Sequence, residues 1–355
     1  EVFNFVIVAA GIFSVPRSAS VPGADSFCGE WIHSAEYRKP VRFAQRRVLV
    51  IGAAFSGADI AADLAGTAAS VTVATRRPLW YLPRYVGGRP IDHAFYSRAA
   101  WERGRGATEE ESNQKRHAFF ASVVGALPPS IPTPNPNRDL PFVAITDTFV
   151  DVCNEGTVVV RDAVVSVSGP SVTFADGHKE DFDVVISATG YLPSLHFIGE
   201  LLKSVEFDPN DLLQPTILHE CVWRPELPAL AFVGMYRGPY FAAIELQARW
   251  ACGVFSGRLP PPVEEEVRAG LEAERRVRDQ VPRPQFPHGD YVGMAERLAK
   301  LVGVHPTDLL AEENPLQKLL FDGPLLPFHY RLVGFGAKPQ LAETAIRECA
   351  TKYPW

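Results

Sequence analysis

The stretch RRVLVIGAAFSGADIAADLAG, residues 46–66, runs from an apolar segment through a glycine turn into a helical pattern. Residues 48–51 are continuously apolar, as expected of a parallel strand that is covered on both faces. Beyond the turn, apolar residues recur at helical spacing, and the pattern stops at Gly66, a natural helix C-cap. The stretch SVTVATRR, residues 70–77, is typical of a second strand. Residues 46–77 therefore predict the mononucleotide-binding half of a Rossmann domain.

The turn itself, GAAFSG at residues 52–57, departs from the usual glycine pattern at its middle place. In a Rossmann turn the first glycine permits the bend, the second admits the pyrophosphate, and the third lets the helix approach the strand. Gly52 and Gly57 fill the first and third places, whereas Ala54 adds a methyl group at the second. The helix start still offers N–H groups and a positive dipole end to phosphate. From the turn alone, a dinucleotide site and a plain strand-to-helix connection both stay open.

The end of the second strand indicates which dinucleotide to expect. NAD sites usually place an acidic residue there for the ribose hydroxyls, whereas a phosphorylated ribose needs a cation. This strand ends in Arg76 and Arg77, nineteen and twenty positions after Gly57, with no acidic residue nearby. We therefore expect NADP(H). The alternative is two solvated arginines at a strand end, because arginine is common on surfaces.

Two more apolar runs, FVIVAAG from Phe5 and FDVVISATG from Phe182, also end on glycine. Together with the central run they favour an α/β architecture with parallel strands. A strand as apolar as the first run needs neighbours on both sides. Because that run stands almost at the start of the sequence, we expect a further segment that precedes it.

The remaining chain alternates between irregular, extended and helical patterns. Residues 126–141 are too rich in proline for a helix or a central strand. Residues 157–177 alternate in polarity and contain turn signals, which predicts an antiparallel ribbon. A strong helical pattern runs from Tyr240 to a stop at Gly257, and the charged stretch 264–280 predicts a solvated peripheral helix.

Composition limits the partners and the location. A net charge of −6 and a pI near 5.9 argue against nucleic-acid binding. No apolar run reaches the ~18 residues that a membrane span requires. The five cysteines are odd in number and widely spaced, which favours reduced thiols in the cytoplasm. No metal-ligand cluster and no Ser-His-Asp arrangement has convincing spacing, so we expect no metal site.

Four motifs in order resemble the flavin-containing monooxygenase family. FCGEWIHSAEY, residues 27–37, matches its identifying pattern F-x-G-x-x-x-H-x-x-x-Y in full, and GAAFSGADIA resembles its NADP turn, in which alanine is seen at the middle place. ISATGY, residues 186–191, is similar to the segment that links the NADP domain back to the FAD domain. Residues 228–257 resemble the final FAD-domain strand and its helix. The resemblance spans residues 3–260.

The resemblance implies an α/β fold with two Rossmann-like, three-layer dinucleotide-binding domains. The family's FAD domain opens on a G-x-G-x-x-G turn, which is absent ahead of Gly52. The FAD domain is therefore expected to be incomplete at its N-terminus, and this chain alone is not expected to hold FAD tightly. The expected division is 1–44 and 190–262 for the FAD domain, 45–189 for the NADP domain, and 263–355 for a C-terminal helical extension.

The function implied by the resemblance is that of an NADPH-dependent flavin monooxygenase with FAD as its second cofactor. One oxygen atom from O₂ passes from a C4a-hydroperoxyflavin to the nitrogen or sulfur of a small amine or thioether. Three alternatives stay open: a truncated, non-catalytic NADP-binding remnant, a Baeyer–Villiger ketone monooxygenase, and a disfavoured simple NADP dehydrogenase. A homodimer is compatible with this interpretation.

The expected cofactor contacts follow the matched motifs, and we assign no catalytic residue. They are Gly52, Ala54, Ser56, Gly57, Ala58, Asp59, Arg76, Arg77, Thr189, Tyr191 and Gln247. The resemblance gives His33 a structural role at the domain junction and no acid–base role. PLWYLPRY, residues 78–85, resembles a family W-x-x-x-R segment, which either lines the nicotinamide cleft or packs a surface loop.

Overall fold

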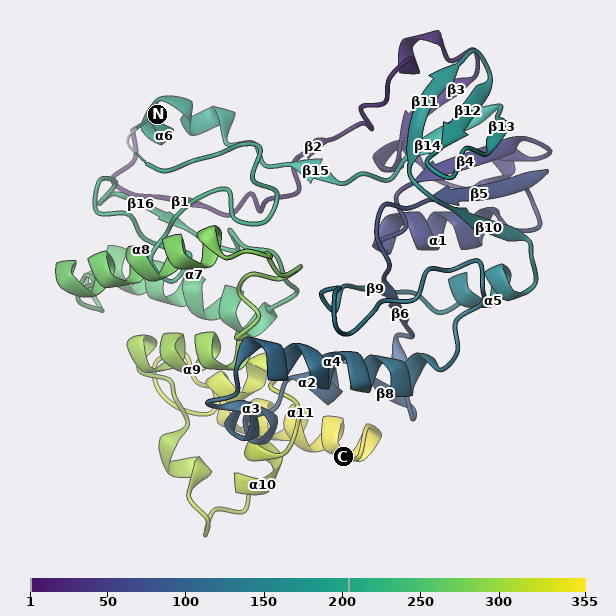
Figure 1. The fold of residues 1–355 in the computed structure, drawn as a ribbon. Helices are drawn as coiled ribbons and strands as arrows, with labels where there is room; N and C mark the ends of the chain where they lie inside the picture. Colours follow the sequence, from purple (N-terminus) through teal and green to yellow (C-terminus); the bar gives the residue numbers. More distant parts are fainter. Residues whose placement is uncertain (1, 204) are drawn as a thin grey trace. The chain divides into compact units, whose positions relative to one another are not determined.

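The computed structural model describes residues 2–203 and 205–355, which fold into two compact units (Figure 1). One unit, here called the sheet unit, comprises Val15–Val86 and Ala107–Tyr191. The other, here called the helical unit, comprises Glu1–Ser14, Gly87–Gly106 and Leu192–Trp355. This division differs from the expected one at residues 15–44, 87–106 and 190–191, and it joins residues 263–355 to the rest of the helical unit, because strand pairing and helix packing join segments that are distant in sequence.

The sheet unit is built on a parallel sheet of five strands in the part of the chain that the structure describes. Its strand order is β10 (Val158–Arg161), β5 (Ser70–Ala74), β4 (Arg47–Ile51), β14 (Val184–Ser187) and β3 (Glu30–His33). The chain leaves β4 toward β5 and β10, and returns on the other side of β4 as β14. This is a topological switch point, beside which ligands bind at the carboxyl ends of strands in open α/β sheets.

The expected antiparallel ribbon at residues 157–177 is only partly correct. Its first part is β10, which pairs in parallel with β5. The rest is an antiparallel sheet of β11 (Val164–Ser168), β12 (Ser171–Phe174) and β13 (Lys179–Asp181). Its turns contain Gly169 and Gly177, both with positive φ, as the turn signals predicted.

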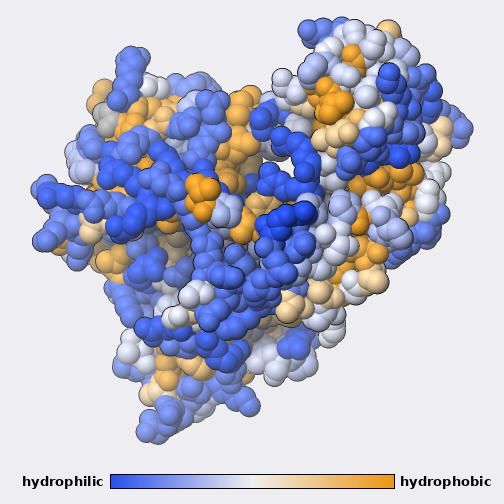
Figure 2. All heavy atoms as spheres, in the orientation of Figure 1, coloured by the Kyte–Doolittle hydropathy of each residue, from blue (hydrophilic) through white to orange (hydrophobic). Residues whose placement is uncertain are grey.

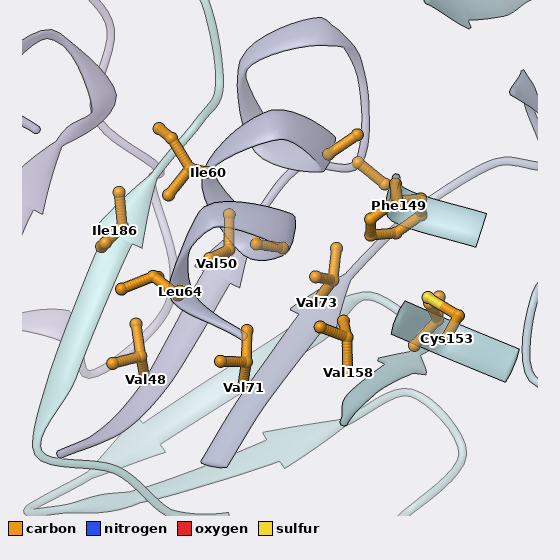
Figure 3. Packing of buried hydrophobic residues seen from close by; sticks show 14 of the residues in the cluster. Val48, Val50, Ile60, Leu64, Val71, Val73, Phe149, Cys153, Val158 and Ile186 are labelled. Atoms are coloured by element: carbon orange, nitrogen blue, oxygen red, sulfur yellow. The ribbon is translucent and has the colours of Figure 1, made fainter. Parts of the chain in front are cut away.

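Both faces of the parallel sheet are covered, which explains its continuously apolar strands. On one face α1 (Phe55–Leu64) packs over the sheet, and α5 (Phe149–Asn154) lies beside it (Figure 3). The side chains packed there include Val48, Val50, Ile60, Leu64, Val71, Val73, Phe149 and Ile186. On the other face Leu49 and Val185 pack with β11 and β12. Each fully buried side chain of this kind contributes about 1.5–3 kcal/mol, so the helix is held firmly over the sheet.

The sheet unit also contains shorter elements. They are β2 (Val15–Pro16), β6 (Trp80–Leu82), β7 (Tyr85–Val86), α4 (Glu109–Val124), β9 (Val143–Ile145) and β15 (Tyr191–Leu192), whose last residue belongs to the helical unit. No helix or strand is assigned between α4 and β9 in this described segment, as its proline content predicted.

The helical unit contains a short parallel pair and a set of packed helices. Its elements are β1 (Val6–Val8), β8 (Arg89–Pro90), α2 (Asp92–Phe95), α3 (Arg98–Gly104), α6 (Gly199–Leu202), β16 (Leu230–Phe232), α7 (Phe241–Phe255), α8 (Glu264–Asp279), α9 (Tyr291–Val302), α10 (Gln317–Phe321) and α11 (Pro339–Lys352). β1 pairs with β16, and α7 packs against α9 through a core rich in aromatic residues, including Tyr240, Trp250 and Tyr291. Among the described residues, no helix is long and apolar enough to cross a membrane.

The first strand and the residues just before it carry an exposed apolar surface. Phe3 is 67% exposed and Phe5 48% exposed, and Val6 and Ile7 are also exposed. Figure 2 shows hydrophobic residues at the surface on the side where β1 and α6 lie in Figure 1. The pairing of β1 with β16 therefore leaves part of the apolar surface of this segment exposed.

A buried ion network connects α3 to the C-terminal helices of the helical unit. Arg98, 3% exposed, donates to Glu296 Oε1 at 2.8 and 3.1 Å and to the Leu320 carbonyl at 2.7 Å. Tyr330 donates its hydroxyl proton to the same carboxylate oxygen at 2.6 Å, and His305 Nε2 lies 2.7 Å from Glu296 Oε2. Residues 87–106 therefore lie with the C-terminal helices because α3 supplies the cation of this network.

The network keeps the Glu296 carboxylate ionised. Burial opposes ionisation, but the hydrogen bond from His305 and the charge of Arg98 outweigh it and lower the pKa of Glu296 to about 2. A lowered pKa contributes stability that is complete above the unfolded value of 4.5 and is lost as pH falls through the folded value. We infer that this part of the helical unit loosens in strong acid.

Candidate functional site

The glycine turn between β4 and α1 lies at the switch point of the parallel sheet. Gly52 has φ +111°, and a Cβ at this position would lie 2.4 Å from the Ala188 carbonyl oxygen. A Cβ on Gly57 would lie 1.8 Å from the Gly52 carbonyl oxygen and 3.4 Å from the Ala188 Cβ. The two glycines therefore have separate physical requirements: Gly52 for its backbone conformation and Gly57 for the close approach of helix to turn.

Hydrogen bonds fix the turn to the neighbouring strands. The Gly52 N–H donates to the Ala74 carbonyl at the end of β5, at 2.9 Å. The Ala188 N–H donates to the Ile51 carbonyl at the end of β4, also at 2.9 Å. The carboxyl ends of β4, β5 and β14 thus hold one rigid loop, which suits a binding site that must be preorganised.

Alanine is accommodated at the middle place of the turn because that place needs no special backbone conformation. Ala54 is the N-cap of α1, with φ −81° and ψ −163°, an ordinary extended conformation. No side chain of the described residues caps this helix start. The first N–H groups of the helix are therefore available to an anion, and the positive end of the helix dipole favours one.

The other predicted contacts on α1 differ in what they can offer. Ser56 is exposed in the first turn, and Asp59 is exposed one turn further along. Ala58 is fully buried against the sheet, and its N–H donates to the Ala54 carbonyl at 2.9 Å. Ala58 therefore contributes packing, while Ser56 has a side chain at the helix start. Direct contacts from these residues to a cofactor remain predictions.

Arg76 and Arg77 lie just beyond β5, at the same edge of the sheet as the turn. Both are exposed, and neither forms an ion pair with any carboxylate in the described part of the chain. The Arg77 guanidinium lies over the Phe142 ring, 4.8 Å from its centroid. Burial, followed by the charge of Arg76, lowers the pKa of Arg77. Two cations that lack a protein counter-charge are the feature that a phosphorylated ribose requires.

The identifying motif at residues 27–37 attaches β3 to this site. Gly29 is needed because a Cβ would lie 2.4 Å from the Asp183 carbonyl oxygen and 2.7 Å from the Phe27 ring. His33 Nδ1 accepts from the Ala35 N–H at 3.1 Å, and Nε2 lies 3.0 Å from the Gly190 carbonyl. Both ring nitrogens of His33 are therefore engaged with the backbone, which supports a structural role.

The last residue of the motif contacts α1. The Tyr37 hydroxyl donates to Asp63 Oδ2 at 2.6 Å, and its ring stacks on Phe43 with centroids 5.7 Å apart. Burial and the Asp63 carboxylate raise the pKa of Tyr37 well above its usual value. The motif thus holds the helix whose N-terminus forms the candidate site.

Thr189 and Tyr191 lie where the chain leaves the parallel sheet. The Thr189 hydroxyl donates to the Arg17 carbonyl. The Tyr191 ring packs edge-on against His33, with centroids 5.2 Å apart. These contacts give both residues a structural role in the segment after β14, and their contact with a cofactor stays a prediction.

Gln247 lies in the helical unit and is fully buried in α7. Its Oε1 accepts from the Gly234 N–H at 3.0 Å, and its Nε2 donates to the Glu220 carbonyl at 2.9 Å. The Tyr291 hydroxyl accepts from the Ala242 N–H in the first turn of the same helix, at 3.3 Å. The start of α7 is thus more fully bonded within the protein than the start of α1, and a flavin contact by Gln247 stays a prediction.

The W-x-x-x-R segment is a buried strand, so the surface-loop alternative is wrong for Trp80. β6 pairs in parallel with β9, and Trp80 donates its Nε1 proton to His117 Nδ1 at 2.9 Å. Arg84 is exposed and forms an ion pair with Asp147 at 2.6 Å. Both side chains have partners within the sheet unit.

Sequence reasoning missed Ala188 as the packing partner of the glycine turn. Its signal was present in ISATGY, because a small residue after β14 is what permits the close approach to Gly52 and Gly57.

A carboxyl group with a strongly lowered pKa lies at the other end of the sheet. Hydrogen bonds from Arg47 lower the pKa of Asp183 to about 2, and this pair connects the starts of β4 and β14. We regard that pair as structural.

Comparisons with known proteins agree with the architecture. Residues 1–349 match the family model described as "Flavin-binding monooxygenase-like". Flavin-containing monooxygenase 5 of Rattus norvegicus is 35% identical over 366 residues, and dimethylaniline monooxygenase (N-oxide-forming) 2 of Mus musculus is 32% identical over 356. These matches cover 95% and 94% of this chain and 64% of each relative, so the chain spans less than two thirds of their length.

Solved structures show the same fold at lower identity. Cyclohexanone monooxygenase from Rhodococcus sp. Phi1 bound to NADP+ has a TM-score of 0.58 and 20% identity, covering 84% of this chain and 73% of that one. S-allyl-L-cysteine S-oxygenase from Allium sativum has a TM-score of 0.55 and 20% identity, covering 99% and 59%. Both support an α/β fold with two dinucleotide-binding domains.

Proposed function

Because this chain belongs to the flavin-binding monooxygenase-like family, we propose that its protein is an NADPH-dependent flavin monooxygenase. The substrate class we propose is a small molecule with a soft nucleophilic nitrogen or sulfur, and O₂ is the second substrate. The relatives named for N-oxide formation support this class. The free state of all five cysteines supports a reducing compartment, the cytoplasm.

The observation that carries the proposal is the glycine turn, with a helix start that no described side chain caps and two arginines that form no ion pair with the described residues. The first N–H groups of α1 would receive the pyrophosphate of NADPH. Arg76 and Arg77 would bind the 2′-phosphate, each in a charge-assisted contact of the kind guanidinium groups make with phosphate. The hydride and the oxygen chemistry would come from the bound nicotinamide and flavin. The residues of this chain bind and orient the nicotinamide dinucleotide.

FAD is assigned by family membership and has weaker support within this chain. The helical unit contributes β1, β16 and α7, whose first turn is partly occupied by Tyr291. We therefore propose that FAD is held by the complete protein, with this chain supplying one part of the FAD domain. A flavin absorption spectrum of the complete protein distinguishes a flavoprotein from a non-catalytic NADP-binding remnant.

The preference for NADPH over NADH is expected to depend on the two arginines. Replacing both, as R76Q/R77Q, should weaken NADPH binding about 100-fold or more, because each arginine loses a hydrogen bond to a charged group that contributes about 1.5–3 kcal/mol. The affinity for NADH, which lacks the 2′-phosphate, should change less than threefold or so by the same reasoning. Isothermal titration calorimetry with each dinucleotide measures both effects.

Arg116 on α4 provides a matched control. It is an exposed arginine of the same unit and lies outside the turn, so R116Q removes a positive charge without touching the site. R116Q should retain the NADPH affinity of the unmodified chain. Equal affinity of the unmodified chain for NADPH and NADH would contradict the assignment of the arginines.

A further inference from the structure

Three potential metal ligands from distant parts of the helical unit meet in its interior. They are Cys221, Glu274 on α8 and His288, and one ligand atom from each lies within 4.8 Å of the other two. Cys221 is 3% exposed and His288 7% exposed, and Glu274 is partly buried. The sequence separates these residues too widely for a ligand motif, so the expectation of no metal site could not take them into account.

Buried polar atoms without hydrogen-bond partners in the described chain lie at His288 and at Gln214, which contacts Glu274. His288 Nε2 lies 2.8 Å from Glu274 Oε2, whereas His288 Nδ1 is buried and has no hydrogen-bond partner among the described residues. Gln214 is buried and donates its Nε2 protons to Glu274 Oε2 at 2.6 Å, while its Oε1 is likewise without a partner in the described chain. An unsatisfied buried acceptor costs about 1–3 kcal/mol, so a cation, or a water bound to it, would relieve this deficit at Gln214 Oε1.

The backbone at the cysteine is unusual as well. Glu220 and Cys221 have φ of +48° and +57°, in the left-handed region that non-glycine residues seldom adopt. Such strain costs of order 1–3 kcal/mol per residue and is concentrated at functional sites. The strained turn, stabilised by a bond from Gln247 Nε2 to the Glu220 carbonyl, is what brings Cys221 into the interior.

We propose that Cys221, Glu274 and His288 form a binding site for a zinc ion. The donor set of one sulfur, one imidazole nitrogen and one carboxylate oxygen suits zinc, because hard cations such as Mg²⁺ and Ca²⁺ select oxygen ligands alone. Three protein ligands leave a fourth position for water or for the Gln214 amide oxygen. This site lies in the helical unit and does not depend on the function proposed for the glycine turn.

The binding step is balanced by the loss of one proton. Zn²⁺ replaces the proton of the Cys221 thiol, which leaves to solvent, and the proton between His288 Nε2 and Glu274 moves to His288 Nδ1, so thiolate and carboxylate together neutralise the ion. Ligand atoms around tetrahedral zinc are roughly 3.3–3.7 Å apart from the known bond lengths. The 2.8 Å contact between His288 and Glu274 must therefore lengthen by about half an ångström, a shift within side-chain reach.

Zinc binding to the purified chain tests the proposal directly. Competition against a chromophoric chelator should give one Zn²⁺ per chain, and C221S should weaken the affinity at least about 100-fold, more than an outer-shell change costs. Q214L, which removes the amide that supports Glu274, should weaken it about 10–100-fold. The matched control is C252S, because Cys252 is an exposed free cysteine of the same unit, and it should bind zinc like the unmodified chain.

Cobalt substitution identifies the sulfur ligand. The Co²⁺-loaded chain and C252S should show a thiolate-to-cobalt charge-transfer band that C221S lacks. If C221S does not fold, E274Q and H288Q serve instead, and zinc should raise the Tm of the unmodified chain more than that of either variant. No zinc bound, a cobalt spectrum without the thiolate band, or equal zinc affinity in C221S would each overturn the proposal.

Discussion

Replacing Gly57 by alanine is expected to weaken NADPH binding 100-fold or more and to destabilise the sheet unit. The added Cβ would lie 1.8 Å from the Gly52 carbonyl oxygen and 2.8 Å from its carbon, which are backbone atoms that cannot rotate away. The start of α1 must therefore move off the turn. Losing two charge-assisted hydrogen bonds to the pyrophosphate costs about 3–6 kcal/mol in binding.

The same displacement lowers the free energy of unfolding. Overpacking in a rigid core costs about 1–3 kcal/mol, and Gly57 is surrounded by the fully buried packing of α1 on the parallel sheet. Urea unfolding and calorimetric titration with NADPH measure the two effects separately. Wild-type affinity in a folded G57A chain would show that the helix start is not the pyrophosphate site.

Ala54 supplies the control at the neighbouring place in the turn. A54G restores the glycine of the usual pattern at a position where the backbone is already unstrained. Because glycine and alanine differ by only a few tenths to about 1 kcal/mol at a helix N-cap, the stability change should be small. NADPH binding should remain or improve, since the change only removes a methyl group.

Replacing Arg98 by methionine is expected to cost the helical unit about 3–5 kcal/mol, the loss typical when one partner of a buried ion pair is removed. The Glu296 carboxylate would keep its hydrogen bonds from Tyr330 and His305 but lose the cation that offsets its burial. The Leu320 carbonyl would lose its donor as well. Urea unfolding followed by tryptophan fluorescence should show a lower midpoint.

An exposed pair on the same helix provides the comparison. Arg105 and Glu102 form an ion pair at 3.0 Å with well-exposed side chains. R105M should therefore change the free energy of unfolding by no more than about 0.5 kcal/mol. The double variant R98M/E296Q should recover part of the loss, because it removes the uncompensated charge. A loss below about 1 kcal/mol in R98M would contradict a central role for the network.

Sequence patterns were sufficient to predict the helices and strands whose formation depends on residues close together in the chain. The apolar runs predicted β4, β5 and β14, and the helical spacing predicted α1 and α7, because a strand or helix that buries a face must repeat apolar residues with its own period. The positive φ of Gly52 and the two cations after β5 also followed from positions in the chain. The candidate site could be proposed from the sequence because a Rossmann turn is one continuous segment.

The sequence was insufficient where the structure depends on contacts between segments that are distant in the chain. The strand at Val158–Arg161 has the same alternation in a parallel sheet as in an antiparallel ribbon, and only its partner β5 distinguishes the two. Likewise, nothing in residues 87–106 indicates that Arg98 reaches Glu296, almost two hundred residues later. Alternation records which face is buried and carries no information about the neighbouring strand.

The sequence by itself determined the parallel α/β class, the glycine turn and the two arginines that follow the second strand, since each is a feature of one continuous segment of the chain. Only the tertiary structure decided that Gln247 is held by two backbone groups, that His33 has both nitrogens engaged, and that Cys221 meets Glu274 and His288. Those contacts join segments that are separated by tens of residues or more. Packing of the whole hydrophobic core brings these segments together, so no single stretch of sequence specifies the contacts.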